Sequence, residues 1–257
     1  MSKTQQYYYE ELGKIDFFKV RPEMIPFVGE EYDTYKVLQL GESHYFHHTS
    51  KEPEEFGIKY FVDKWLELDP CEDFMMKYGE GVNTREDIEE YMKGETKNYP
   101  AYYNFLKAMS EGVLGNPIES ISRGSDEQKL FKYIAYTDYF MMPALYFDKK
   151  HLPDSVAFSI NRLPKDEQEL YQYKETMDRI ADFSNRIIEQ VIDILNPRAI
   201  VFTSKNGGDF FKEHNSKYAN DKRMIYAYHP VNIGGKWAKS EEYGHPHVVT
   251  ELKKIYS

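Results

Sequence analysis

The sequence predicts an α/β fold, in which three layers (α/β/α) surround a short central parallel sheet of about four strands. Two observations favour this fold. Four short apolar segments recur along the chain with helical material between them. None of the four alternates cleanly between apolar and polar residues, which is typical of strands that are buried on both faces. Strands that alternate with helices form right-handed crossovers, and these place helices on both faces of the sheet.

Each predicted strand is a short run of apolar or β-favouring residues. The first is nearly continuous in apolar residues apart from Gln39, and the second is rich in aromatic residues. The four segments are KVLQLG (36–41), YIAYTDYF (133–140), RAIVFTS (198–204) and RMIYAYHP (223–230).

The longest predicted helix precedes the third strand. From Tyr173 onwards, apolar residues recur with the period of an α-helix as far as Leu195. The dipeptide Asn196-Pro197 then ends the helix, because a proline cannot continue the hydrogen-bond pattern.

The remaining helices have weaker signals. Ser204 predicts an N-cap directly after the third strand, although Gly207-Gly208 lowers the helix propensity there. Further helices are predicted over 102–109, after a capping box of Ser125 and Gln128, and over 248–255.

Composition predicts one domain, and the charged residues are unevenly distributed along the chain. The chain has 257 residues, 41% of them apolar, and we expect a single domain over 1–257. Residues 51–95 hold 14 Asp/Glu against 6 Lys/Arg, and they belong to a predicted, mostly helical acidic insertion at about 47–130. Residues 198–239 hold 8 Lys/Arg against 3 Asp/Glu. Two interpretations stay open: ordinary solvated surfaces, or a locally basic face where the last strands end.

The totals also restrict the compartment and the partners. The net charge of −10 argues against a simple, strong nucleic-acid binder. The single cysteine, Cys71, excludes an internal disulfide framework and fits a reducing compartment. No stretch approaches the roughly 18 apolar residues that span a membrane, and the start lacks a basic region followed by an apolar run. We expect a cytoplasmic protein that does not enter a membrane.

Unusual polar groups lie at the ends of three of the predicted strands. Parallel strands end at one edge of a sheet, where ligands bind in α/β proteins. A carboxylate, a hydroxyl and an imidazole are therefore expected to converge there. The three segments are Gly41-Glu42-Ser43-His44-Tyr45, Thr137-Asp138-Tyr139 and Tyr228-His229-Pro230-Val231-Asn232.

These motifs resemble those of the uracil-DNA glycosylase superfamily. GESHY is similar to the first family motif, of the GQDPY or GExPG type, and AYHPVN is similar to the final His-Pro-Ser motif. Between them, EQVIDILNPRAIVFTSKNGGDFF resembles the family's helix, strand, glycine-containing turn and helix. The resemblance covers residues 36–46 and 133–237, and it implies base flipping and DNA repair.

The resemblance implies roles for the residues of the first motif. Gly41 and Glu42 fall on the Gly and the Gln or Glu of that motif. Ser43 falls where several branches place a water-orienting Asp or Asn, and Tyr45 falls on the Tyr that closes one side of the base pocket. Either Glu42 or Asp138 would hold or polarise water or stabilise positive charge on the sugar, and Ser43 would help to position that water.

The later motifs complete the implied site. Asp138 falls near the base-reading Asn, and His229 and Pro230 fall on the final His-Pro. His229 would donate a hydrogen bond to the base oxygen as negative charge develops on the leaving group. Ile233 or Trp237 could fill the gap left by a flipped nucleotide. We also expect His44, Tyr139 and Asn232 to contact the substrate.

Three functions remain open at this stage. The first is hydrolysis of the N-glycosidic bond of a damaged or deaminated base in DNA, without metal or other cofactor. The second is a non-catalytic member that binds a nucleotide, nucleic acid or protein partner, which Ser43, Val231 and the acidic total motivate. The third is a metal-dependent hydrolase that uses His44, His47 and His48, but their spacing matches no standard zinc pattern.

Overall fold

The fold is built on one five-stranded sheet with the strand order β1-β3-β2-β4-β5. The computed structural model describes residues 1–44, 62–68, 83–95, 100–115, 128–142, 167–214, 216–231 and 235–257. The strands are β1 (Phe27–Val28), β2 (Val37–Gly41), β3 (Ile134–Asp138), β4 (Ala199–Phe202) and β5 (Met224–Tyr226). The last four run parallel to one another, as the sequence predicts.

The prediction of a purely parallel sheet is wrong at one edge. Strand β1 pairs antiparallel with β3, placing Phe27 opposite Tyr136 and Val28 opposite Ala135, so the sheet is mixed. A two-residue strand is too short to give a periodic signal. At the opposite edge β5 is shorter than predicted, because the chain leaves the sheet before Tyr228. The Tyr228 amide donates to the carbonyl of Tyr243 instead of to a strand.

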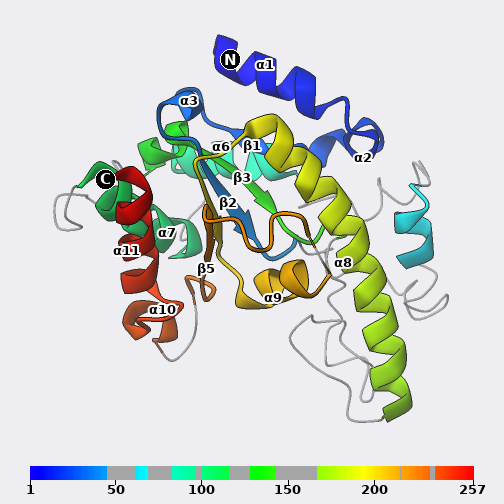
Figure 1. Cartoon of the computed structure of the whole chain (residues 1–257). Coiled ribbons are helices and arrows are strands. Elements are labelled where there is room, and N and C mark those ends of the chain that lie inside the picture. The colour runs from blue at the N-terminus through cyan, green and yellow to red at the C-terminus, as the bar shows by residue number, and fades with distance from the viewer. Residues whose placement is uncertain are drawn as a thin grey trace.

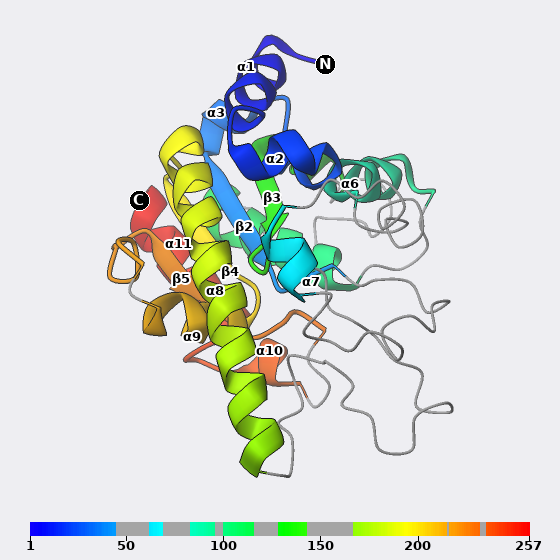
Figure 2. The same cartoon turned by 90° about the vertical axis from the view of Figure 1, so that its right-hand side faces the viewer.

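Helices of one layer cover the face of the sheet that carries Leu38, Leu40 and Phe202 (Figure 2). Buried residues of these helices form one hydrophobic cluster with that face. The helices are α1 (Lys3–Leu12), α2 (Asp16–Val20), α8 (Glu167–Leu195) and α9 (Lys205–Glu213). The short helix at 62–66 adds Val62 and Trp65 to the same cluster.

Helices of a second layer cover the face that carries Val37, Tyr136 and Val201 (Figure 1). They are α6 (Thr84–Lys93), α7 (Pro100–Met109), a π-helical turn (Ser110–Leu114), α10 (Lys236–Lys239) and α11 (His245–Tyr256). The chain is therefore an α/β protein with helices on both faces of its sheet. The remaining short elements are α3 (Tyr32–Tyr35) and 3-10 turns at Pro22–Met24 and Gln128–Tyr133.

Most of the predicted helices are confirmed. Helix α8 ends at Leu195 and α7 and α11 include the predicted segments, whereas Ser125 lies outside the described residues. Helix α9 tolerates its two glycines because it packs closely on the sheet. A Cβ added at Gly208 would lie 2.5 Å from Cδ1 of Tyr226, and one at Gly207 would lie 3.1 Å from Cδ1 of Tyr139.

The described parts of the acidic segment 47–130 are mostly helical and pack on the sheet from both sides. Of the helices that the structure describes, none is long and apolar enough to cross a membrane.

Candidate functional site

The candidate site lies at the carboxyl edge, which we define as the last residues of β2, β3, β4 and β5 together with the residues that follow them. Strand β2 has β3 on one side and β4 on the other, so the strand order reverses direction between β2 and β4. Such a switch point is where open α/β sheets bind ligands. Glu42 follows β2 and Ser204 follows β4, and Ser204 Oγ donates a hydrogen bond to Glu42 Oε2 at 3.0 Å.

Ser204 fixes Glu42 relative to a helix terminus. Its hydroxyl oxygen also accepts from the amide of Gly207 at 3.1 Å, so Ser204 is the N-cap of α9, as the sequence predicts. The positive end of the helix dipole stabilises a carboxylate at this position. Glu42 is therefore held as an acceptor at the switch point.

Gly41 ends β2 because a neighbouring carboxylate occupies the space of a side chain. Gly41 lies opposite Asp138 in the parallel register. A Cβ added at Gly41 would lie 2.0 Å from Asp138 Oδ1 and 2.5 Å from the Tyr136 hydroxyl oxygen. The glycine lets the two strand ends approach while Asp138 keeps its place.

Asp138 is a buried carboxylate whose two oxygens face protein groups. Its exposed fraction is 5%, Tyr136 OH donates to Oδ1 at 2.9 Å, and His44 Nε2 lies 3.4 Å from Oδ2. Burial, followed by the charge of Asp138, raises the pKa of Tyr136 well above its usual value, so this hydroxyl stays protonated. These contacts compensate the desolvation of Asp138.

His44 links Asp138 to α6. Its Nε2 lies 2.8 Å from Thr84 Oγ1, and its Nδ1 lies 3.9 Å from Asp87 Oδ2. Burial raises the pKa of Asp87 to about 6, the nearby His44 opposes this shift, and Asp138 adds to it. We call these five residues the polar network: Tyr136, Asp138, His44, Thr84 and Asp87.

Thr84 and Asp87 are site residues that the sequence analysis missed. They share the inward face of α6 with the buried Ile88 and Tyr91. Their spacing from Ile88 and Tyr91 places them on the apolar face of a helix. A polar residue on such a face is the signal that could have identified them.

His229 lies shortly after β5, and one of its ring nitrogens is held by a backbone contact. The amide of Val231 donates to its Nδ1 at 3.3 Å, so the proton of the neutral imidazole is on Nε2. Desolvation lowers the pKa of His229, and the negative charge of Asp138 opposes that shift. The ring is thus a neutral Nε2–H donor at pH 7, and it remains accessible to solvent.

The loop that carries His229 is anchored to α7. Pro230 is buried, and its carbonyl accepts from Asn104 Nδ2 at 2.8 Å. Asn104 has no signal of its own in the sequence, because an amide on a predicted helix looks like an ordinary exposed residue.

Two of the predicted contacts are wrong. Tyr139 points away from Asp138, because successive residues of an extended chain face opposite sides. It is fully buried, and its hydroxyl donates to Asn185 Oδ1 at 2.7 Å. Trp237 is buried beside His245 and cannot act as an exposed wedge.

The other predicted residues have mixed positions. Ser43 is 8% exposed, and among the described residues its hydroxyl has no hydrogen-bond partner. Tyr45, Asn232 and Ile233 lie outside the described residues.

Comparison with protein-family models, curated proteins and solved structures finds no match. The geometry of the carboxyl edge is therefore what a functional proposal rests on.

A metal site has no support in the described part of the chain. There, no group of three or more His, Cys, Asp or Glu side chains is placed to hold a metal ion. His47 and His48, from the predicted histidine cluster, lie outside that part. The described member, His44, faces Thr84, Asp87 and Asp138 instead.

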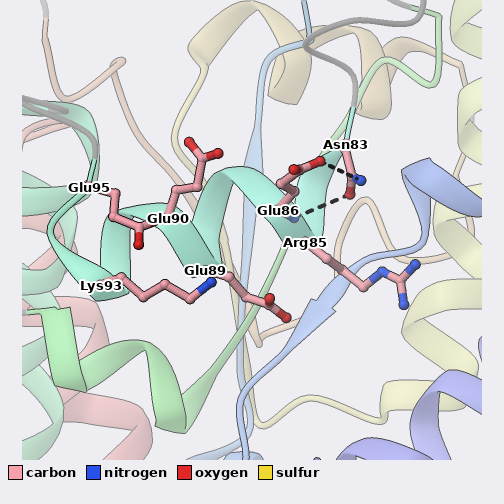
Figure 3. A pocket seen from close by; sticks show the side chains of 7 residues that line it. All are labelled: Asn83, Arg85, Glu86, Glu89, Glu90, Lys93 and Glu95. Carbon is pink, nitrogen blue, oxygen red and sulfur yellow. Dashed lines mark hydrogen bonds between the residues drawn. The ribbon is translucent and has the colours of Figure 1, made fainter.

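A surface pocket of about 440 Å³ lies along the outer face of α6 (Figure 3). Four glutamates outnumber its two cationic side chains, so the pocket disfavours phosphate-bearing ligands. Thr84 and Asp87 project from the opposite face of the same helix. The pocket is lined by Asn83, Arg85, Glu86, Glu89, Glu90, Lys93 and Glu95.

Proposed function

We propose that the chain is a uracil-DNA glycosylase-like protein that binds an extruded base at the carboxyl edge and hydrolyses its N-glycosidic bond. The observation that carries the proposal is the state of His229. Its Nδ1 accepts from the Val231 amide, which leaves a neutral Nε2–H donor beside the strand ends. A base that leaves with the bonding electrons needs such a donor at its carbonyl oxygen.

Glu42 supplies the second half of the proposed reaction. The bond between the base and the anomeric carbon breaks, and a water oxygen bonds to that carbon. The base takes the electron pair, and a proton from the water balances its charge. Glu42, held by Ser204, accepts a hydrogen bond from this water and stabilises the positive charge of the sugar.

Asp138 is better suited to positioning than to contacting the base. Tyr136 and His44 engage its two oxygens. A carboxylate that faced the departing base would repel its developing charge. We therefore assign the water to Glu42 and assign the alignment of the strand ends to Asp138.

The test is base excision by the purified protein. Single- and double-stranded oligonucleotides that contain uracil, hypoxanthine or xanthine are incubated and treated with alkali. We expect strand cleavage at one of these bases and a strong loss of cleavage in Glu42→Gln. The exposed control Glu30→Gln should cleave as well as the unmodified protein. Absence of cleavage on all of the substrates would contradict the catalytic proposal.

A second candidate is a binding protein without catalysis. The observation that favours it is the burial of Ser43, whose hydroxyl is withdrawn from solvent where a water-orienting group is expected. Thermal stabilisation by free nucleobases, with no excision of any base, would support this candidate over the first.

A further inference from the structure

Two tyrosines and two lysines form a surface group beside the carboxyl edge. We call Lys205, Tyr228, Lys236 and Tyr243 the lysine–tyrosine patch. The ring centroids of Tyr228 and Tyr243 are 5.6 Å apart, with an angle of 66° between the ring planes. Lys236 Nζ lies 5.6 Å from the Tyr228 centroid, and Lys205 Nζ lies 5.5 Å from the Tyr243 centroid.

The fold places this patch next to the candidate site. Tyr228 directly precedes His229, and Lys205 directly follows Ser204. The Tyr228 amide donates to the Tyr243 carbonyl at 2.7 Å, which fixes the segment before α11 against the chain after β5. Both rings are half-buried, so they are supported by the protein and still reachable. Figure 1 shows α9 and α10 at the end of the molecule away from α1.

Charge is distributed unevenly within the patch. Lys205 forms an ion pair with Asp209 at 2.5 Å, and the neighbouring Glu242 raises the pKa of Tyr243. Lys236 is exposed and forms no ion pair within the described residues. Lys236 is therefore the cation most available to an anionic ligand, and it belongs to the locally basic segment 198–239.

We propose that the lysine–tyrosine patch binds single-stranded DNA. A nucleotide combines a flat base with a phosphate, and the patch combines an aromatic ring with an adjacent ammonium group. Stacking on tyrosine needs an open base face, which a duplex does not offer. The inference builds on the proposed function, since the patch would hold nucleotides that flank the base beside His229.

Stacking is tested by the fluorescence anisotropy of a labelled oligothymidylate, which contains no base to be excised. We expect Tyr228→Ala and Tyr243→Ala to weaken binding roughly 5- to 150-fold, the range for one lost stacking partner. Tyr228→Phe should bind like the unmodified protein, because the ring remains. Tyr7→Ala, which removes an exposed tyrosine of the distant α1, is the matched control.

The phosphate contact is tested by the salt dependence of the same binding. We expect Lys236→Gln to reduce the slope of log K against log salt concentration by about 0.7, the value for one phosphate on a single strand. Lys3→Gln, an exposed lysine of α1, should leave the slope unchanged. Competition by duplex of the same length should be weak.

Two results with the labelled probe alone would overturn the proposal that the patch binds single-stranded DNA. One is an oligothymidylate that binds all the variants equally, and the other is a protein that does not bind the probe at low salt. Neither bears on base hydrolysis, which the excision assay measures separately. A duplex that competes as well as the single strand would also exclude stacking as the mode of binding.

Discussion

His229 is held by a backbone contact that leaves one ring nitrogen free, and this makes its role measurable. If its Nε2–H stabilises the leaving base, His229→Ala should lower the excision rate on the order of 10- to 1,000-fold, the range for one lost transition-state donor. Base affinity should fall much less, because the hydrogen bond strengthens only as charge develops. Single-turnover rates and equilibrium binding on one modified oligonucleotide separate the two effects.

A histidine that lies away from the carboxyl edge serves as the control. His214, at the far end of α9, contacts Asp178 and Asp182 instead of the carboxyl edge. His214→Ala should keep the full excision rate. Equal losses of rate and affinity in His229→Ala would make His229 a binding residue, and an unchanged rate would remove it from the site.

The residues of the site differ in how far the sequence could predict them. Glu42, Asp138 and His229 are recognisable because they lie at or shortly after the carboxyl ends of strands. The reason for Gly41 was hidden, because it depends on the parallel register with Asp138. Tyr139 was misassigned because a short motif does not show on which face of the sheet each of two neighbouring residues lies.

Helix α6 connects a charged surface to the buried polar network. Its outer face carries the glutamates of the surface pocket, and its inner face brings Thr84 and Asp87 to His44. The pKa of Asp87 is raised to about 6, chiefly by burial, from an ordinary carboxyl value near 4. The charged form of Asp87 is thus disfavoured in the folded state.

This shift predicts how stability changes with pH. Between about pH 4 and 6 the folded state binds more protons at Asp87 than the unfolded state does, so its contribution to stability falls as the pH rises. Asp87→Asn should therefore raise the urea midpoint at pH 7. The difference from the unmodified protein should shrink towards zero as the pH falls to about 4.

The control for this prediction is Glu89→Gln on the exposed face of the same helix. Its urea midpoint should follow that of the unmodified protein at every pH. An Asp87→Asn midpoint that is lower at pH 7, or shifted equally at all pH values, would show that the Asp87 charge stabilises the fold or does not titrate in this range.

Elements with a long periodic signal were predictable, and short ones were not. Helices α7, α8 and α11 follow from apolar spacing, and the Ser204 cap marks the start of α9. Strand β1 has two residues and is defined only by its pairing with β3. The inner face of α6 was obscured by the surrounding glutamates, which look like a uniformly solvated helix.

At the scale of the whole molecule, one sheet separates two hydrophobic clusters. Alternate residues of the same strand serve both, as Val37 belongs to one cluster and Leu38 to the other. The sequence predicts parallel strands with helices on both faces. It does not predict the strand order, because that depends on the side of β2 on which β3 pairs and the side on which β4 pairs.

The shared sheet predicts that both layers unfold together, and the two tryptophans can report on this. Trp65 belongs to the cluster under α8, and Trp237 belongs to the cluster under α11. Trp237→Phe leaves only the first probe and Trp65→Phe leaves only the second. In each single-tryptophan protein, fluorescence should give the same midpoint as far-UV circular dichroism, as a two-state transition requires.

Cavities on opposite faces then test the coupling. Leu12 of α1 and Leu252 of α11 are fully buried in different clusters, so each change to alanine should cost about 2–5 kcal/mol of unfolding free energy. Because the strands are common to both clusters, Leu12→Ala should lower the midpoint reported by Trp237 as much as that reported by Trp65. The converse should hold for Leu252→Ala. A midpoint that moves only on the side of the cavity would mean that the two layers unfold independently, and that the chain is not one cooperative domain.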